Sequence, residues 1–219
     1  MAQTLKNCTA DPLEWNEMIN LVHRLFKNGE KNERNYKLSL LIALSSFFLL
    51  RISDTLAFKF SDLIEIDIEG KYFVKSEIVV IEQKTKKRRT IPINEQFRGH
   101  ILNCFYKING LNADKLKVVN LDRYIFTSQK NSIYKVQSIN KIFKTLIKTY
   151  NLSIKNFSTH SCRKAGSLFL FNQYSKENNG HMAIVYLMEV LSHSSPSITL
   201  TYIGVKKANL THIFDKMYI

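Results

Sequence analysis

Residues 35–54 of the chain are NYKLSLLIALSSFFLLRISD. From position 35 to position 50 this segment is apolar over most of its surface, which predicts a helix at the centre of a domain. Its longest apolar run, residues 38–50, contains serines and is shorter than the roughly 20 residues that cross a bilayer. The segment therefore predicts a buried core helix, followed directly by a charged residue, Arg51.

Helical spacing continues on both sides of this core. Asp11 and Pro12 are typical of an N-cap and a first helical position, and Asn28-Gly29 ends the helix that they predict. Residues 53–58 predict a short helix capped by Ser53-Asp54. The remaining predicted helices cover residues 95–108, 138–150 behind a serine cap, 159–173, 181–191, 196–203 and 207–217.

Between residues 63 and 93 the pattern changes to β-branched and aromatic runs. Three strands are predicted, at residues 63–68, 72–81 and 89–93. The link between the last two includes residues 84–89, in which five of six side chains are basic, and a hairpin this basic could lie along phosphates. The predicted fold is mainly α with a small three-stranded antiparallel β-sheet, in a single domain over residues 1–219.

The charge balance points to an anionic partner. The chain has 32 Lys+Arg against 18 Asp+Glu, a net charge of +14, and a pI of about 9.7. Nucleic acid or an anionic membrane face would suit such a charge, and so would a solvated lysine-rich surface without a specific partner. Charge alone leaves these alternatives open.

Cysteine usage and the N-terminus indicate a cytoplasmic protein. The three cysteines, Cys8, Cys104 and Cys162, have neither CxxC spacing nor an even count, which argues against a disulfide framework or a zinc site. Residues 1–10 lack the basic start and apolar stretch of a secretory signal. We expect the protein in a reducing cytoplasm.

Polar side chains suited to phosphodiester chemistry occur in a fixed order along the chain. They are Arg51, Lys84, His160, Arg163, His193 and Tyr202. Singly, each has a more ordinary explanation: a packed tyrosine among 10, a solvated lysine, capping histidines, or an arginine paired with Asp54. Together they are the parts needed to attack a phosphodiester with a phenol.

Five segments that contain these residues resemble the motifs of the tyrosine recombinases, the family of phage integrases. Residues 50–63 resemble the family's first conserved box, and residues 83–93 its β-hairpin lysine segment. Residues 159–163 are similar to the HxxR motif, and residues 191–202 match the histidine box and the nucleophilic tyrosine. The match covers nearly the whole chain, and its strength lies in the order and spacing of the motifs.

The resemblance implies a role for each residue. Tyr202 would attack the scissile phosphorus, Arg51 and Arg163 would stabilise the growing charge, and His193 would add a donor. Lys84 would be the general acid, and His160 would assist proton removal or hold the phosphate. Asp54 would orient an arginine without contacting the reacting phosphate. The expected DNA contacts are Lys86, Lys87, Arg88, Arg89 and Lys164.

The chain departs from the family pattern at three motif positions and in length. Leu49 and Ser192 stand where the family usually has glycine, and Lys164 where many members have histidine. We expect the helical core-binding domain that commonly precedes the catalytic domain to be absent from these 219 residues. The chain is therefore either part of a longer protein or a short member that resembles the fimbrial switch invertases.

The resemblance implies a site-specific recombinase that cleaves and rejoins duplex DNA through a 3′-phosphotyrosine intermediate, in integration, excision or inversion. It implies no cofactor and no metal. Double-stranded DNA would be the partner, and accessory DNA-bending proteins could take part. The protein would form a homotetramer on DNA and could be a monomer when free. It would be located at the nucleoid. A type IB topoisomerase and a non-catalytic DNA-binding regulator are the alternatives.

Overall fold

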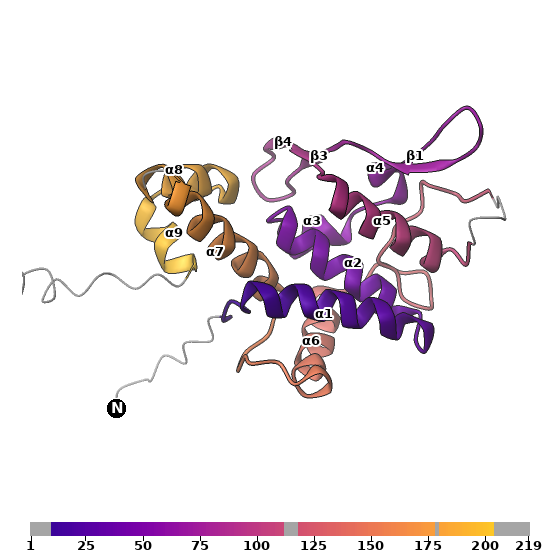
Figure 1. Ribbon diagram of the computed structural model, residues 1–219, viewed down its shortest axis with the longest axis horizontal. Coiled ribbons are helices and arrows are strands. Elements are labelled where there is room, and N and C mark those ends of the chain that lie inside the picture. The colour runs from indigo at the N-terminus through magenta and orange to yellow at the C-terminus, as the bar shows by residue number, and fades with distance from the viewer. Residues whose placement is uncertain (1–9, 112–117, 178–179, 204–219) are drawn as a thin grey trace, which may run out of the picture.

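The computed structural model describes residues 10–111, 118–177 and 180–203. Helices make up most of this part of the chain, and two short β-hairpins lie at its edge (Figure 1). The elements in chain order are α1 (Trp15–Lys27), η1 (Asn28–Glu30), α2 (Arg34–Phe47), α3 (Ile52–Leu56), α4 (Phe60–Leu63), β1 (Ile64–Ile66), β2 (Tyr72–Val74), β3 (Glu77–Ile81), β4 (Arg88–Pro92), α5 (Glu95–Ile108), α6 (Val136–Tyr150), α7 (Thr159–Glu177), α8 (Gly180–Leu191) and α9 (Pro196–Ile203).

The predicted central helix is confirmed as α2, which packs against α1, α3, α5 and α7. Every residue from Leu38 to Ser46 is buried. The buried serines are satisfied locally: the Ser39 hydroxyl donates to the Val22 carbonyl at 2.8 Å, and the Ser46 hydroxyl to the Ile42 carbonyl at 2.7 Å. Small hydroxyl groups thus let neighbouring helices approach α2 without leaving a polar atom unpaired.

The helices α7, α8 and α9 form a second packing unit at one end of the molecule (Figure 1). Its buried core consists of Leu49, Leu187, Leu191 and Ile203. Leu49 follows α2, so this small cluster joins the end of the central helix to α8 and α9. The arrangement brings the C-terminal end of α8 next to the start of α3.

The predicted antiparallel strands are present, but they form two two-stranded sheets in place of one three-stranded sheet. The strand predicted over residues 72–81 is divided at Lys75 and Ser76: β2 pairs with β1, and β3 pairs with β4. The Lys75 amide donates to the Leu63 carbonyl and its ammonium to the Ser61 carbonyl, at 3.0 and 2.7 Å. These bonds hold the chain back towards α4 at the point where the apolar run is interrupted.

Three predicted helix starts are wrong. The helix predicted over residues 53–58 behind a Ser53-Asp54 cap is α3, which begins at Ile52 with Arg51 as its N-cap and ends at Leu56. The first helix begins at Trp15 and not beside Asp11, because the Glu14 carboxylate caps it. The helix predicted from a Ser138 cap begins at Val136, so that serine lies inside its first turn.

Other predicted bounds agree better with the structure. The predicted bounds of α5 and α9 are confirmed, and α7 continues four residues beyond its predicted end. The short helix α4 was not predicted. The helix predicted over residues 207–217 lies outside the described residues. None of the described helices has the length and apolar character needed to span a membrane.

Gly166 of α7 lies directly against the backbone of α2. A Cβ atom at this position would lie 1.9 Å from the Ser46 carbonyl oxygen of α2 and 2.7 Å from the Leu49 side chain. Gly99 of α5 is a matched control, because a Cβ there would meet nothing within 4 Å.

We therefore expect Gly166→Ala to lower the free energy of unfolding by about 2 kcal/mol through overpacking. Gly99→Ala should raise it by up to about 1 kcal/mol, because alanine favours a helix over glycine. Urea denaturation followed by circular dichroism measures both. Equal effects of the two substitutions would contradict the close contact.

Candidate active site

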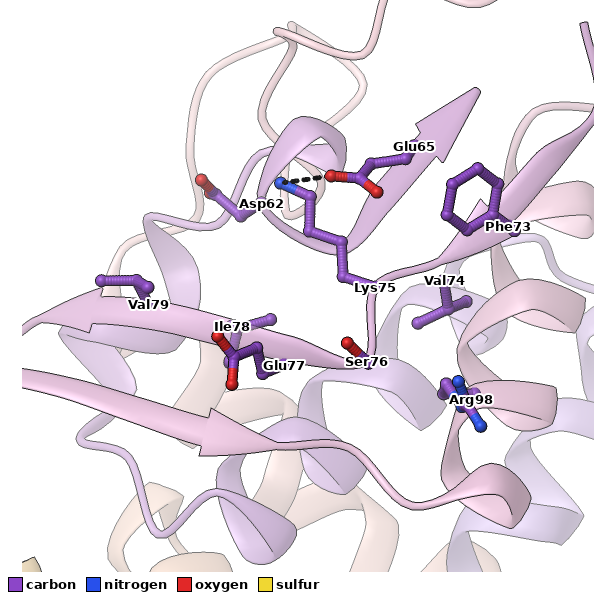
Figure 2. Close-up of a pocket in the computed structure, with 10 residues that line it drawn as sticks. All are labelled: Asp62, Glu65, Phe73, Val74, Lys75, Ser76, Glu77, Ile78, Val79 and Arg98. Carbon is purple, nitrogen blue, oxygen red and sulfur yellow. Dashed lines mark ion pairs between the residues drawn. The ribbon is translucent and has the colours of Figure 1, made fainter. Parts of the chain in front are cut away.

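A cavity of about 520 Å³ lies between the two hairpins and α5 (Figure 2). It contains the Lys75–Glu65 ion pair, at 3.9 Å, with Asp62, Glu77 and Arg98 around it. None of the six predicted catalytic side chains lines this cavity. The candidate site is defined instead by contacts between α3, α7, α8 and α9.

The two predicted catalytic arginines converge on one backbone carbonyl. Arg51 is the N-cap residue of α3, and Arg163 lies in the first part of α7. Their Nη2 atoms donate to the Leu191 carbonyl at 3.4 and 3.3 Å. Because the C-terminal end of a helix carries a partial negative charge, the end of α8 attracts both guanidinium groups to the same point.

His193 and Tyr202 lie beside the arginines. Their rings meet edge to face, with centroids 5.2 Å apart, and His193 Nδ1 is 3.1 Å from the Thr199 hydroxyl. Burial raises the pKa of Tyr202 to about 12, although the positive charges of Arg163 and Arg51 act to lower it. Tyr202 is therefore a neutral phenol at physiological pH in the DNA-free protein.

Two buried polar atoms at this point have no partner in the described part of the chain. They are Nε of Arg163 and the hydroxyl oxygen of Tyr202. Burial also lowers the pKa of Arg163 to about 10, so the guanidinium remains charged at neutral pH. Unpaired buried donors are costly, and they are found where a ligand supplies the missing acceptor. The arrangement suits an anion with several oxygens.

The structure places His160 near this cluster and Lys84 further out. His160 is largely exposed at the start of α7, and partial burial together with the charges of Arg163 and Lys164 lowers its pKa. Lys84 is exposed in the turn between β3 and β4 and makes no hydrogen bond or ion pair with a described residue. Four of the six side chains are thus gathered directly, and the roles of all six remain proposals.

A buried carboxylate that the motif analysis missed, Glu82, holds the arginines. It is 1% exposed and accepts from Arg51 at 2.6 Å, from Arg89 at 3.3 Å and from the Thr85 hydroxyl at 2.6 Å. One signal could have indicated it: Glu82 is the acidic residue immediately before the basic turn.

The predicted role of Asp54 as the carboxylate that orients an arginine is corrected. Asp54 Oδ1 accepts from the Gln83 backbone N–H at 3.0 Å, and within the described ranges Asp54 forms no ion pair with an arginine. Asp54 is buried and bonds to the backbone of Gln83, whereas the carboxylate of the neighbouring Glu82 lies 2.6 Å from Arg51 Nη1 and takes the arginine.

The predicted DNA contacts divide into two groups. Lys86, Lys87 and Arg88 are exposed on the hairpin, as a phosphate contact requires. Arg89 and Lys164 instead point inwards: Arg89 pairs with Glu82, and Lys164 donates to the Ala10 carbonyl at 2.7 Å. Successive side chains along β4 point to opposite faces, so Arg89 lies on the other face from Arg88. The sequence-based prediction treated both arginines as DNA contacts.

A family model for the phage integrase family matches residues 16–209, most of the chain. The chain belongs to the phage integrase family. The described part of this integrase-family chain contains no group of three His, Cys, Asp or Glu side chains that could hold a metal ion.

Three known proteins show how far the likeness extends. The probable integrase/recombinase YoeC of Bacillus subtilis is 29% identical over 89% of each chain. The tyrosine recombinase XerC of Caldanaerobacter subterraneus is 26% identical over 71% of this chain and 40% of its own. The crystal structure of the XerH site-specific recombinase bound to palindromic difH substrate has a TM-score of 0.64 at 18% identity, covering 99% of this chain and 55% of that one. This integrase-family chain therefore spans about half the length of the XerH chain and less than half of the XerC relative.

The two positions at which this integrase lacks the usual family glycine both have left-handed backbone. The φ angles are 53° at Leu49 and 57° at Ser192. Residues with a Cβ adopt this conformation at a cost of about 1–2 kcal/mol. At both positions the backbone therefore has a conformation that glycine adopts without this cost.

We expect Ser192→Gly to be more stable than Ser192→Ala by about 1 kcal/mol, because only glycine relieves the left-handed strain. Both substitutions remove the hydroxyl, which lies 3.5 Å from Glu82, so their difference isolates the backbone term. Chemical denaturation measures it. Equal stability would show that no strain is stored at position 192.

The raised pKa of Tyr202 predicts a late titration of this phenol. At about pH 11 a tyrosine of ordinary pKa is mostly ionised, whereas Tyr202 should remain mostly neutral. Because the folded pKa exceeds the unfolded value, this group favours the folded state less as pH rises above about 10. The Cζ chemical shift of labelled tyrosine, assigned with Tyr202→Phe, measures the titration, and ionisation of Tyr202 below pH 10 would contradict the burial argument.

Proposed function

We propose that this domain is the catalytic part of a site-specific DNA recombinase that breaks and rejoins duplex DNA through a 3′-phosphotyrosine intermediate. The observation that carries the proposal is the convergence of Arg51, Arg163, His193 and Tyr202, with buried donors of Arg163 and Tyr202 unpartnered among the described residues. A backbone phosphate supplies the acceptor oxygens that these donors require.

The cleavage step is a transfer of the phosphoryl group from one oxygen to another. The Tyr202 phenolic oxygen forms a bond to phosphorus as the bond from phosphorus to the 5′-oxygen breaks. The phenol proton leaves to His160, whose lowered pKa leaves the imidazole neutral and able to accept it. Lys84 gives a proton to the departing 5′-oxygen. Reversal of the step by a 5′-hydroxyl from another strand reseals the DNA, so the energy of the bond is retained.

The arginines would stabilise the transition state. Each guanidinium places planar N–H donors on non-bridging oxygens, whose charge grows as the phosphorus becomes five-coordinate. Arg163 is 5% exposed. The Nη2 donor of Arg51 lies next to it, on the same Leu191 carbonyl. In a site this buried the charge interaction is stronger than in water.

The exposed face of the β3–β4 hairpin would provide part of the grip on DNA. Lys86, Lys87 and Arg88 lie on it, and the whole chain carries a charge of +14. Contacts of this kind bind phosphates without reading the sequence, so affinity should fall steeply with salt. Among the structural relatives, a Tn1549 transposon integrase was solved in complex with circular intermediate DNA and the XerH recombinase bound to its difH substrate, which supports DNA as the partner proposed for this chain.

The proposal is tested by trapping the covalent intermediate. Nicked suicide duplexes that tile the DNA on both sides of the chain's own gene should yield a covalent protein–DNA adduct, visible by denaturing electrophoresis. Tyr202→Phe should reduce adduct formation by more than about 1,000-fold, because the nucleophile is removed. DNA affinity should stay within about threefold, because the phenol is not a phosphate-binding cation.

Tyr174→Phe is the matched control, because this tyrosine is exposed on α7 and outside the site. It should leave adduct formation unchanged. Persistence of the adduct in Tyr202→Phe would place the nucleophile elsewhere. Relaxation of plasmids without any special site would favour a type IB topoisomerase, and binding without an adduct on any duplex would favour a non-catalytic regulator.

A further inference from the structure

Glu82 lies where four segments of the chain meet. Its Oε2 atom accepts from Arg51 at the start of α3 and from Thr85 in the hairpin turn, both at 2.6 Å. Its Oε1 accepts from Arg89 on β4 at 3.3 Å. The Ser192 hydroxyl, from the segment between α8 and α9, lies 3.5 Å from Oε2. A single side chain therefore links parts that are far apart in sequence.

The carboxylate of Glu82 is charged in the folded protein. Its burial, at 1% exposure, acts against ionisation, but the Thr85 hydroxyl and the Arg51 guanidinium outweigh it and lower the pKa of Glu82. A buried charge with several donors is costly to disturb, because removing one partner leaves the others unpaired. Glu82 is therefore a rigid point from which its partners are oriented.

Hydrogen bonds to α3 and to Glu82 fix the chain on both sides of Lys84. On one side, the Gln83 N–H donates to Asp54 at 3.0 Å, and the Gln83 side chain donates to the Ser53 carbonyl at 3.2 Å. On the other side, Thr85 donates to Glu82. The Lys84 side chain itself is exposed. The turn that carries the proposed general acid is thus held in register with Arg51, while the lysine keeps its freedom to move.

We propose that Glu82 is a positioning residue that couples the Lys84 turn to the phosphate-binding arginines, because its carboxylate bonds both to Thr85 in the turn and to Arg51 in the phosphate clamp. The effect on cleavage rests on the proposed function. The coupling of the turn to Arg51 is a property of the folded chain and can be measured without DNA.

The test compares Glu82→Gln with Glu77→Gln. Glu77 is an exposed residue at the start of β3, and Glu82 directly follows the end of this strand, so both substitutions remove one negative charge from the same part of the hairpin. Hydrogen exchange of residues 82–89 should become roughly tenfold faster in Glu82→Gln and stay unchanged in Glu77→Gln, because only the former loosens the turn. Adduct formation on the suicide duplex should slow by about 10- to 100-fold in Glu82→Gln, as for the loss of an orienting partner.

A substrate with sulfur at the 5′ bridging position separates positioning from a general loss of structure. A thiolate leaves without a proton, so it removes the need for a general acid. This duplex should restore much of the rate in Glu82→Gln and in Lys84→Ala, but not in Arg163→Lys, which damages the clamp itself. Thr85→Val is a milder variant. It removes the hydroxyl that donates to Glu82 and accepts from the Lys87 N–H, and it leaves both arginine pairs of Glu82 in place. Its effects should follow the same pattern and be smaller.

Each outcome decides between the ideas. Equal exchange and equal adduct rates in Glu82→Gln and Glu77→Gln, or no change in Thr85→Val if Glu82→Gln does not fold, would overturn the coupling. Slow cleavage that the sulfur substrate does not restore would also overturn it, since Glu82 would then serve the arginines alone. If exchange changes as expected but the wild-type chain forms no Tyr202-dependent adduct on any duplex, the coupling stands and the proposed function fails.

Discussion

The contact between Gly166 of α7 and the Ser46 carbonyl of α2 determines how closely these two helices pack. No side chain larger than that of glycine fits there, since a Cβ would lie 1.9 Å from that oxygen. Arg163 lies one helical turn before Gly166, and Arg51 follows shortly after α2. The separation of the two guanidinium groups therefore depends on how these helices pack. Leu49, with its left-handed backbone, turns the chain between the end of α2 and Arg51.

Electrostatics then determines which way these side chains point. Three guanidinium groups, those of Arg51, Arg89 and Arg163, share one buried carboxylate and the carbonyl at the end of α8. One negative charge does not balance three positive ones, so the site keeps a net positive charge after its internal bonds are formed. Such a site is organised in advance for an anion, and little rearrangement of donors is needed when the anion binds.

Local sequence patterns predicted elements well where a single interaction decides them. The bounds of α5 follow from its Asn94 cap and its apolar spacing, and α2 follows from an apolar run that only a core can hold. The patterns failed where two local signals compete. Asp11 and Glu14 can each cap a helix. The apolar runs on either side of residues 75–77 were predicted as one strand, because the sequence does not show that Lys75 bonds back to α4 and divides them.

The motifs that contain Arg51, His160, Arg163, His193 and Tyr202 were enough to indicate the family through their order and spacing. Chemistry on a phosphodiester restricts the residue types, and a shared fold restricts their order along the chain. Only the tertiary structure could show that Glu82 and not Asp54 pairs with Arg51, and that Arg89 and Lys164 turn inwards. The physical reason is that a motif records residue type and spacing, whereas the partner of a buried charge depends on which distant segments the packing of α2, α7 and α8 brings within hydrogen-bond distance.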